Sequence, residues 1–276
     1  MTDTYAVIGN PVAHSKSPAI HAEFARQTRQ DLSYAAIHAE LADFETVVRR
    51  FRDEGGRGLN VTVPFKHRAY AMVQRRSVRA EHAQAVNTMS FDGRDIGGDN
   101  TDGAGLVRDL NHNLGCNLAG RRVLLMGAGG AACGVCGPLL EQKPGALVVA
   151  NRTLEKAERL CERFKSLNAG AAILRAVHYS GLAGEAFDVV INATSAGLSE
   201  AMPPLPLRVF ARGALAYEMV YGRATPFLDF AHREGARTAD GLGMLVEQAA
   251  ESFYIWRGVR PVTAPVIAQL RATTAG

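Results

Sequence analysis

The stretch Arg122-Val-Leu-Leu-Met-Gly-Ala-Gly-Gly-Ala-Ala132 decides the fold of the second half of this chain. Its first part, Arg122–Met126, has the apolar run of a buried strand, and glycines follow at once. Gly127 allows a tight turn, Gly129 lets the backbone approach a pyrophosphate, and Ala132 permits close packing of a helix on the strand. The N-terminus of that helix offers free N–H groups to an anion. We therefore expect a strand, a turn and a helix that bind a dinucleotide, rather than a glycine-rich turn without a ligand.

The residues after the next expected strand, Ala146–Ala150, indicate which dinucleotide binds. An Asp or Glu at this point would hold the ribose 2′-hydroxyl of NAD. This chain has Asn151-Arg152-Thr153 instead, with Lys156 one turn further on. Because a guanidinium binds a phosphate in a planar, bidentate way, Arg152 and Lys156 favour the 2′-phosphate of NADP. The alternative is a helix capped by Thr153 beside two solvated cations.

Strands and helices alternate in the first hundred residues, and this order predicts a mostly parallel sheet. Apolar residues at helical spacing indicate a helix at Ala42–Asp53, and Ser17-Pro18 is typical of a helix start with Ser17 as the cap. Two strands joined by Asp92-Gly93 are expected to form a hairpin. The expected strands of this region are Tyr5–Gly9, Ser33–Ala39, Gly58–Pro64, Ala85–Phe91 and Asp95–Gly98.

A helix at Ala104–Leu114 is expected to lead into a second domain. That domain continues with further predicted elements, the helix Thr153–Lys165 and the strands Phe187–Ala193 and Ala214–Val220. The last two expected helices, Leu242–Trp256 and Ala264–Arg271, have no strand after them, so we expect them to pack back on the first domain. The predicted class is α/β, with one domain at 1–103 and 243–276 and a Rossmann-type domain at 104–242.

Composition is that of a soluble globular protein, with 47% hydrophobic and 21% charged residues in a chain of 276. The net charge of +4 is mild, and its densest cluster, Arg75-Arg76 with Arg79, has no aromatic partners on which bases could stack. We therefore expect no nucleic-acid partner, and a modest positive field that attracts an anionic small molecule.

The N-terminus and the interior of the chain do not predict a membrane protein. The N-terminus lacks an export signal, and the uncharged run Val123–Leu140 is rich in glycine and contains Pro138. The four cysteines are expected to be reduced thiols, as in a cytoplasmic protein. Cys133 and Cys136 have CxxC spacing, but without a second CxxC or a nearby His pair they predict small residues on one helix rather than a redox or metal site.

The stretch Asn60-Val-Thr-Val-Pro-Phe-Lys66 predicts a strand with one wet face, formed by Asn60, Thr62 and Lys66, and one buried face, formed by Val61 and Val63. Its proline is expected to end the strand, since it has no N–H to donate. Such a strand delivers polar groups to the edge of the sheet where clefts form. The lysine is a candidate proton donor, and the alternative is an edge strand followed by a solvated lysine.

Two further clusters contain candidate binding residues, although simple capping would also explain Ser17, but not Ser15. Ser15 and Ser17 stand beside a helix N-terminus, where hydroxyls and free N–H groups suit a carboxylate. Asp102 opens a later helix, so it is either an N-cap or a buried carboxylate partner for Lys66.

Taken together, these motifs resemble the shikimate dehydrogenase family, and they match it in order over nearly the whole chain. The matching segments are Ala6-Val-Ile-Gly-Asn-Pro11, His14-Ser-Lys-Ser-Pro18, Asn60-Val-Thr-Val-Pro-Phe-Lys66, Ala85-Val-Asn-Thr88, Gly98-Asp-Asn-Thr-Asp-Gly103, Gly127-Ala-Gly-Gly-Ala131, Asn151-Arg-Thr153, Ile191-Asn-Ala-Thr-Ser195 and Asp240-Gly-Leu-Gly-Met-Leu245.

The resemblance implies a substrate-binding first domain with Lys66 and Asp102 as the catalytic pair. It implies carboxylate binding by Ser15, Ser17 and Tyr221, and binding of ring hydroxyls by Thr62, Asn87, Asp102 and Gln248, with Asn60 close by. The implied cofactor residues are Gly127, Ala128, Gly129, Gly130, Ala131, Asn151, Arg152, Thr153, Lys156, Thr194, Met219 and Gly243.

The implied activity is reversible reduction of 3-dehydroshikimate to shikimate by NADPH, in chorismate and aromatic amino acid biosynthesis. Lys66 would give a proton to the oxygen of the ring ketone, or take it in reverse. The alternatives are a quinate/shikimate dehydrogenase that uses NAD, a non-catalytic NADP-binding regulator of the same fold, and a two-domain dehydrogenase of folate metabolism, which would not need the paired serines. We expect a cytoplasmic monomer or homodimer whose domains close on the ligands.

Overall fold

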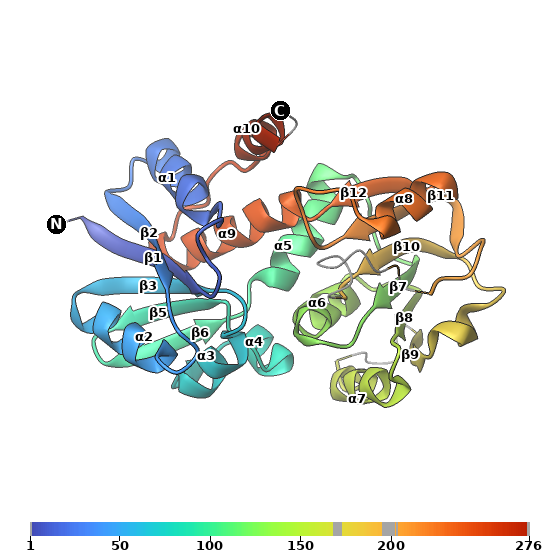
Figure 1. The fold of residues 1–276 in the computed structure, drawn as a ribbon, viewed down its shortest axis with the longest axis horizontal. Coiled ribbons are helices and arrows are strands. Elements are labelled where there is room, and N and C mark those ends of the chain that lie inside the picture. The colour runs from blue at the N-terminus through green and yellow to red at the C-terminus, as the bar shows by residue number, and fades with distance from the viewer. Residues whose placement is uncertain (1, 168–172, 195–201, 203, 275–276) are drawn as a thin grey trace. The chain divides into compact units, whose positions relative to one another are not determined.

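Figure 1 shows the chain as a computed structural model, which describes residues 2–167, 173–194, 202 and 204–274. The chain folds into two compact units. The first unit comprises residues 1–105 and 246–276, and the second comprises residues 106–245. Both boundaries fall inside helices, namely α5 (Asp102–Arg108) and α9 (Leu242–Arg257).

The first unit contains a six-stranded sheet in the order β2-β1-β3-β5-β6-β4. Strand β1 is parallel to β2 and β3, and β4 is parallel to β6, whereas β5 is antiparallel to β3 and to β6. The sheet is therefore mostly parallel, as predicted, with the expected hairpin inside it. The strands are β1 (Asp3–Gly9), β2 (Leu32–His38), β3 (Gly56–Val61), β4 (Arg75–Arg76), β5 (Thr88–Asp92) and β6 (Asp95–Asp99).

Alternate residues of β1 pack against opposite faces of the sheet, which explains why the strand is apolar from Tyr5 to Ile8. Ala6 and Ile8 belong to a core with residues of three helices, α2 (Phe44–Asp53), α3 (Lys66–Met72) and α4 (Val78–Ala83). Tyr5 faces the other way and stacks on Trp256 of α9, with ring centroids 4.7 Å apart. Helix α1 (Ser17–Thr28) lies on this second face, where Phe24 meets Phe253 of α9 edge to face.

The tail helices belong to the first unit, as the sequence predicted. Helix α9 from Val246 onward and α10 (Ala264–Thr274) are grouped with residues 1–105. Val266 of α10 is buried and, with residues of α1, lines a small groove of about 260 Å³.

The second unit has a fully parallel sheet in the order β12-β11-β10-β7-β8-β9. This is the strand order of the Rossmann fold, with the first strand at the centre. Val123 and Leu125 of β7 enter one core with α6 (Gly130–Glu141) and α7 (Leu154–Phe164), whereas Leu124 enters another core beneath α8 (Pro226–Arg233). The strands are β7 (Arg122–Met126), β8 (Ala146–Ala150), β9 (Ile173–Val177), β10 (Phe187–Asn192), β11 (Phe210–Glu218) and β12 (Arg237–Asp240).

The prediction of a strand at Gly58–Pro64 was partly wrong. Strand β3 ends at Val61, and Val63, expected on a buried face, is 62% exposed. Asn60, expected on a wet face, is only 6% exposed. The alternation fails because the chain turns toward α3 after Val61, and because side chains of distant segments cover Asn60.

Other local predictions also differ from the structure. Ser17 is the first residue of α1 rather than its cap; Lys16 is the N-cap and makes no side-chain capping bond. The helix expected at Ala104–Leu114 begins at Asp102 and continues as a π-helix at Asp109–Asn113. Strands β9 and β12 were not predicted, because they are short and mix polar with apolar residues.

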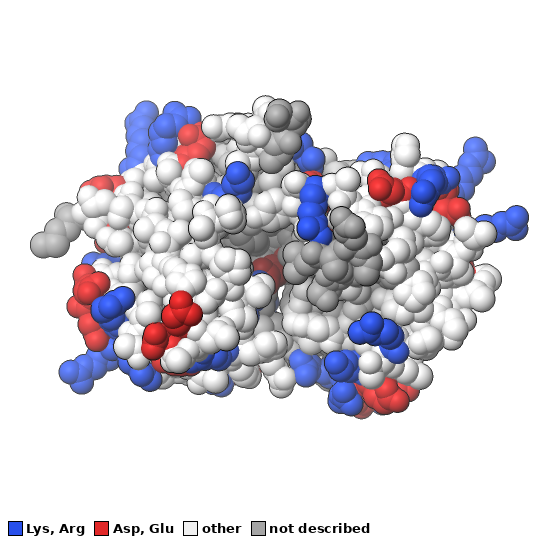
Figure 2. Space-filling model, viewed as in Figure 1, with Lys and Arg blue, Asp and Glu red and all other residues white. Residues whose placement is uncertain are grey.

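Figure 2 shows lysine and arginine side chains interspersed with aspartate and glutamate over the face in view. Within the described ranges, no helix is both long and apolar enough to span a bilayer. Among those same residues, no cluster of three or more His, Cys, Asp or Glu is arranged to hold a metal. Cys133 and Cys136 are free cysteines on α6, and burial raises the pKa of each thiol above its usual value.

Candidate active site

One edge of the first unit's sheet gathers polar side chains from several strands. The register pairs Asn60 of β3 with Thr88 of β5, and Thr88 with Asp99 of β6. Strands β3 and β6 end at this edge, β5 begins there, and helices α3 and α5 start just beyond it. Antiparallel pairing therefore brings together side chains that lie far apart in the sequence.

Lys66 and Asp102 form an ion pair at this edge. The Nζ atom of Lys66 donates to Oδ2 of Asp102 at 2.6 Å, and the two side chains are 30% and 12% exposed. Lys66 opens α3 directly after Phe65, whose buried ring stacks on Phe44 with centroids 4.6 Å apart. Asp102 opens α5. Packing of Phe65 thus fixes the backbone from which the lysine extends.

Asn87 orients the carboxylate of Asp102. The backbone N–H of Thr101 donates to Oδ1 of Asn87 at 2.8 Å, so this atom must be the amide oxygen. The amide nitrogen Nδ2 then faces Asp102 and donates to its Oδ1 at 2.8 Å. Both carboxylate oxygens of Asp102 therefore accept hydrogen bonds, one from an amide and one from an ammonium group.

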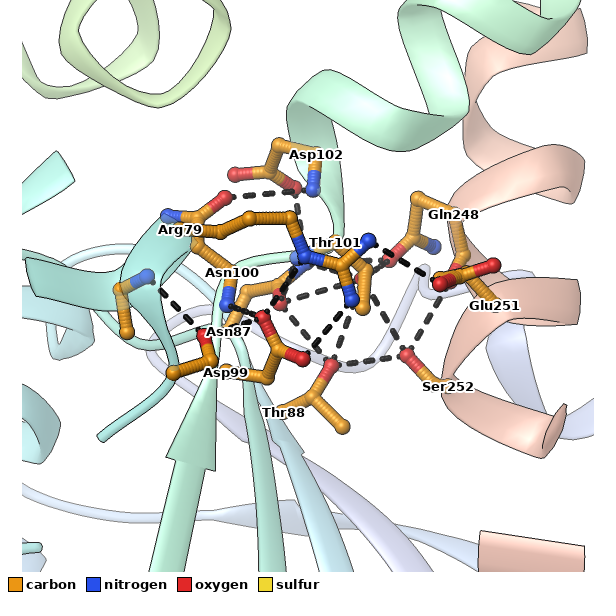
Figure 3. A network of polar contacts seen from close by, with 12 residues as sticks. Arg79, Asn87, Thr88, Asp99, Asn100, Thr101, Asp102, Gln248, Glu251 and Ser252 are labelled. Carbon is orange, nitrogen blue, oxygen red and sulfur yellow. Dashed lines mark hydrogen bonds and ion pairs between the residues drawn. The ribbon is translucent and has the colours of Figure 1, made fainter. Parts of the chain in front are cut away.

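A cluster of buried hydroxyl groups lies beneath Asn87, as Figure 3 shows. Thr88 Oγ1 donates to Oδ1 of Asn87 at 2.9 Å and lies 2.7 Å from the hydroxyl of Ser252 on α9. Thr101 is within hydrogen-bonding distance of both hydroxyls, at 3.3 Å. The three side chains are at most 1% exposed, so they support the site from below.

Asn60 extends this cluster toward α1. Its Nδ2 donates to Ser252 at 2.9 Å, and its Oδ1 accepts from the hydroxyl of Tyr34 at 2.7 Å. Burial raises the pKa of Tyr34 well above its usual value, and a hydrogen bond with Ser17 opposes that shift. Tyr34 therefore stays a donor at neutral pH and connects two of the expected substrate residues, Ser17 and Asn60.

The other expected substrate residues are placed as follows. Gln248 of α9 joins the cluster, since its Oε1 lies 3.2 Å from Nδ2 of Asn87. Ser15 accepts a hydrogen bond from the backbone N–H of Ser17 at 3.3 Å, and Thr62 follows β3, where its N–H bonds to Ile8. Tyr221 belongs to the second unit, and burial raises the pKa of its hydroxyl.

Sequence reasoning missed several residues that support this site, namely Tyr34, Arg79, Thr88 and Ser252. For Ser252, the polar pattern of its helix could have indicated a place in the site. Gln248, Glu251 and Ser252 are polar residues at i, i+3 and i+4 in a mostly apolar helix, a spacing that puts them on one face. For Thr88 the signal was absent, because only strand pairing reveals its neighbours.

The turn between β7 and α6 has the backbone that dinucleotide binding requires. Gly127 has φ +102°, a value that side chains rarely allow, and its N–H bonds to Ala150. At Gly129 an added Cβ would meet no atom within 4 Å, so the turn is open above it. Ala132 is fully buried in the core beneath α6. The expected contacts Ala128, Gly130 and Ala131 lie in the same turn and the first residues of α6.

The segment after β8 presents cations to the surface. Arg152 and Lys156 are exposed, and Asn151 donates through Nδ2 to the carbonyl of Thr153 at 2.8 Å. Thr153 is the N-cap of α7 but makes no side-chain capping bond. The alternative that explained Thr153 as a helix cap therefore loses its support, and the two cations are available to a ligand.

Residues expected near the nicotinamide lie at the ends of β10 and β11 and at the start of α9. Thr194 donates through its hydroxyl to Oδ1 of Asn192 at 2.7 Å, and Asn192 donates through Nδ2 to the buried Glu218 at 2.7 Å. Met219 follows Glu218, and Gly243 lies in the first turn of α9. Ser195, part of the motif matched in this region, lies outside the described residues.

Three family models match the chain in consecutive parts. Residues 7–89 match the shikimate dehydrogenase substrate binding domain, residues 109–199 match shikimate / quinate 5-dehydrogenase, and residues 241–271 match the shikimate 5′-dehydrogenase C-terminal domain. Curated relatives named shikimate dehydrogenase (NADP(+)) align over their full length. The protein of Dechloromonas aromatica is 57% identical and that of Nitrosospira multiformis is 59% identical, each over 99% of this chain and 98% of the relative.

Solved structures agree with these relatives. The shikimate 5-dehydrogenase of Thermus thermophilus in complex with NADP(H) and shikimate superposes with a TM-score of 0.86 at 33% identity, over 98% of this chain and 99% of that one. An Ael1 enzyme from Pseudomonas putida superposes with a TM-score of 0.92 at 51% identity, over 98% of both chains. With matches of this identity over nearly its whole length, the chain belongs to the shikimate dehydrogenase family.

Proposed function

We propose that this protein catalyses the reversible, NADP-dependent interconversion of 3-dehydroshikimate and shikimate in the biosynthesis of chorismate and the aromatic amino acids. The observation that carries the proposal is the ion pair of Lys66 and Asp102, held at 2.6 Å at the polar sheet edge. The names of the relatives and the complex of the Thermus protein support the substrate and the cofactor.

The first unit would bind the substrate and the second unit NADP. The expected ring-hydroxyl and carboxylate ligands of the first unit are Ser15, Ser17, Asn60, Thr62, Asn87, Asp102 and Gln248. Tyr221, the other expected carboxylate ligand, belongs to the second unit. The residues after β7 and β8 fit NADP, because the turn at Gly129 is open and Arg152 with Lys156 can hold a 2′-phosphate. NADP, when bound, supplies the site that gives or accepts a hydride.

The protein's own contribution is to bind the substrate and move one proton. Lys66 uses one N–H to bind Asp102, and another would bind the reacting oxygen of the substrate. Asp102 accepts from both Asn87 and Lys66, so its carboxyl group is fixed in position and orients the side-chain nitrogen of Lys66. The group that gives the proton to the ketone oxygen, or takes it from the hydroxyl, is therefore Lys66.

A steady-state assay tests this proposal. NADPH formation is measured with shikimate and NADP, with quinate and NAD as alternative substrate and cofactor. Lys66→Met and Asp102→Asn are expected to lower kcat by about 10²–10⁴-fold. Lys165→Met is the matched control, because Lys165 is 74% exposed on the surface. Near-normal turnover of either active-site variant would refute the assignment of the pair.

The same assay separates the alternative functions. Quinate carries an extra hydroxyl on the carbon that bears the carboxylate, so the region around Ser15 and Ser17 would decide between the two acids. Equal rates with quinate and NAD would identify a quinate/shikimate dehydrogenase, and binding of NADP without turnover of either acid would identify a regulator. We further propose that the protein is cytoplasmic and is a monomer or a homodimer. Light scattering of the purified chain would distinguish the two oligomeric states.

A further inference from the structure

Arg79 of α4 contacts two carboxylates at the rim of the polar cluster (Figure 3). Its Nε and Nη2 donate to the two oxygens of Asp99 at 3.0 and 2.8 Å, which is a planar, bidentate pair. Its Nη1 donates to Glu251 of α9 at 3.0 Å. The arginine side chain is 30% exposed and each carboxylate 16%, so the group is shielded well beyond an ordinary surface pair.

Asp99 connects this arginine to the catalytic carboxylate. Its Oδ1 accepts from the backbone N–H of Asn100 at 2.6 Å and from the hydroxyl of Ser77, the N-cap of α4, at 2.6 Å. The side chain of Asn100 in turn accepts from the backbone N–H of Asp102 at 3.2 Å. The turn that places Asp102 at the start of α5 is therefore held through Asp99.

Glu251 connects the same arginine to the helix that carries Gln248 and Ser252. Gln248, Glu251 and Ser252 share one face of α9. Gln248 and Ser252 both belong to the cluster around Asn87. Although burial opposes ionisation, hydrogen bonds from Arg260 and Arg79 lower the pKa of Glu251 below its usual value. Arg79 thus lies between two anions, one on each segment that supplies the site.

We propose that Arg79 is a positioning residue for the proposed reaction: it holds the turn Asp99–Asp102 against α9 and so aligns Asp102 with Lys66. This inference rests on the proposed function. A lysine could neutralise the two anions, but it has no planar fork to fix the orientation of Asp99. Loss of the cation leaves the partly buried carboxylate of Asp99 without its paired cation, whereas Glu251 keeps Arg260, and the turn would shift to bring Asp99 to solvent. Displacement of a catalytic group by about 1 Å can cost about 10²-fold in rate.

The test compares Arg79→Met and Arg79→Lys with the wild-type enzyme. We expect kcat to fall by about 10- to 100-fold for Arg79→Met and less for Arg79→Lys, with an unchanged KM for NADP. The decisive readout is the solvent deuterium isotope effect on kcat. It should increase, because misalignment of Asp102 and Lys66 slows proton transfer, whereas an unfolded fraction lowers kcat without altering the isotope effect.

Two further variants serve as a control and as a rescue of Arg79→Met. Arg75→Met is the matched control, since Arg75 is 62% exposed and pairs with Asp92 at the surface at 3.9 Å. Arg79→Met combined with Asp99→Asn removes the uncompensated anion and should recover part of the lost kcat. A kcat and isotope effect in Arg79→Met equal to those of the active wild type would overturn the positioning role. Absence of wild-type turnover would instead overturn the proposed function itself.

Discussion

Tyr217 donates a hydrogen bond to Asp109 across 2.6 Å, and both side chains are buried in the second unit. Asp109 begins the π-helix that extends α5, and its carboxylate packs directly on Gly243 in the first turn of α9. A Cβ at Gly243 would clash with the carboxyl group of Asp109, so a larger residue there would have to displace that side chain. An anion at a helix N-terminus is also electrostatically favourable.

Replacement of Tyr217 by Phe removes one hydroxyl and leaves the ring in place. Because the lost bond is to a charged group, the free energy of unfolding should fall by about 1.5–3 kcal/mol. If Gly243 contacts the nicotinamide as proposed, the dissociation constant of NADP, measured by fluorescence titration, should also rise. Tyr179→Phe is the matched control, as Tyr179 is another buried tyrosine of the same unit. Equal losses in the two variants would contradict a specific role for the bond to Asp109.

The 2′-phosphate role of Arg152 predicts a change of cofactor preference. Arg152→Asp should lower kcat/KM for NADP by about 10- to 100-fold, since a charge-assisted hydrogen bond of about 1.5–3 kcal/mol is lost, while kcat/KM for NAD stays the same or rises. Arg159→Asp, at an exposed position on α7, controls for the change in net charge. An unaltered NADP/NAD ratio in Arg152→Asp would remove the basis for this assignment.

His21 predicts an acid-sensitive component of stability. It is fully buried, its ring stacks on Tyr34 at 4.1 Å, and burial lowers its pKa from 6.5 to about 3. Since the unfolded chain binds the proton more readily, the stabilisation is complete above pH 6.5 and is lost as the pH falls toward 3. The expected loss is about 1.4 kcal/mol per pH unit in that window.

His21→Phe keeps an aromatic ring in the stack and should remove this component. Urea titrations between pH 7 and 4 would measure it, with His14→Asn as a control at an exposed histidine. The explanation fails if wild type and His21→Phe lose stability in parallel over this range.

The orientation of Asn87 predicts a severe effect of a nearly isosteric change. Asn87→Asp would replace the donor that faces Oδ1 of Asp102 at 2.8 Å by a second anion. Like charges at this distance disfavour ionisation of either group and force them apart, so kcat should fall by at least about tenfold. Asn111→Asp, which alters a side-chain bond to Gln142 in the second unit, is the control. Normal turnover of Asn87→Asp would show that its amide does not orient Asp102.

Much of the fold was predictable because its signals are local. The strands Arg122–Met126 and Ala146–Ala150 were predicted with the bounds that the structure has. Continuous apolar runs end there at glycine or at Asn151, so neither the element nor its limits depended on distant residues. The residues alone left Asp102 as either an N-cap or a partner of Lys66, and the resemblance implied the pair; the structure places the two side chains in contact.

The support beneath the site was not predictable, because it depends on contacts between distant segments. Asn60 and Ser252 are separated by 192 positions in the sequence and meet only after α9 packs on the sheet. The same packing buries Asn60, which the local alternation of residues placed on a wet face. Val63 was assigned to a buried face by the same alternation, but the strand had already ended at Val61.

The buried amide of Asn87 also has a consequence for the chemical ageing of the protein. Asparagine is thermolabile because its amide hydrolyses slowly to a carboxylate. At this position the product would place a second carboxylate 2.8 Å from Oδ1 of Asp102, so a single such event would lower the activity of a molecule whose fold is otherwise intact. Prolonged storage at elevated temperature should therefore lower activity faster than it lowers helix content, and peptide mass spectrometry would locate the altered residue in the inactive fraction.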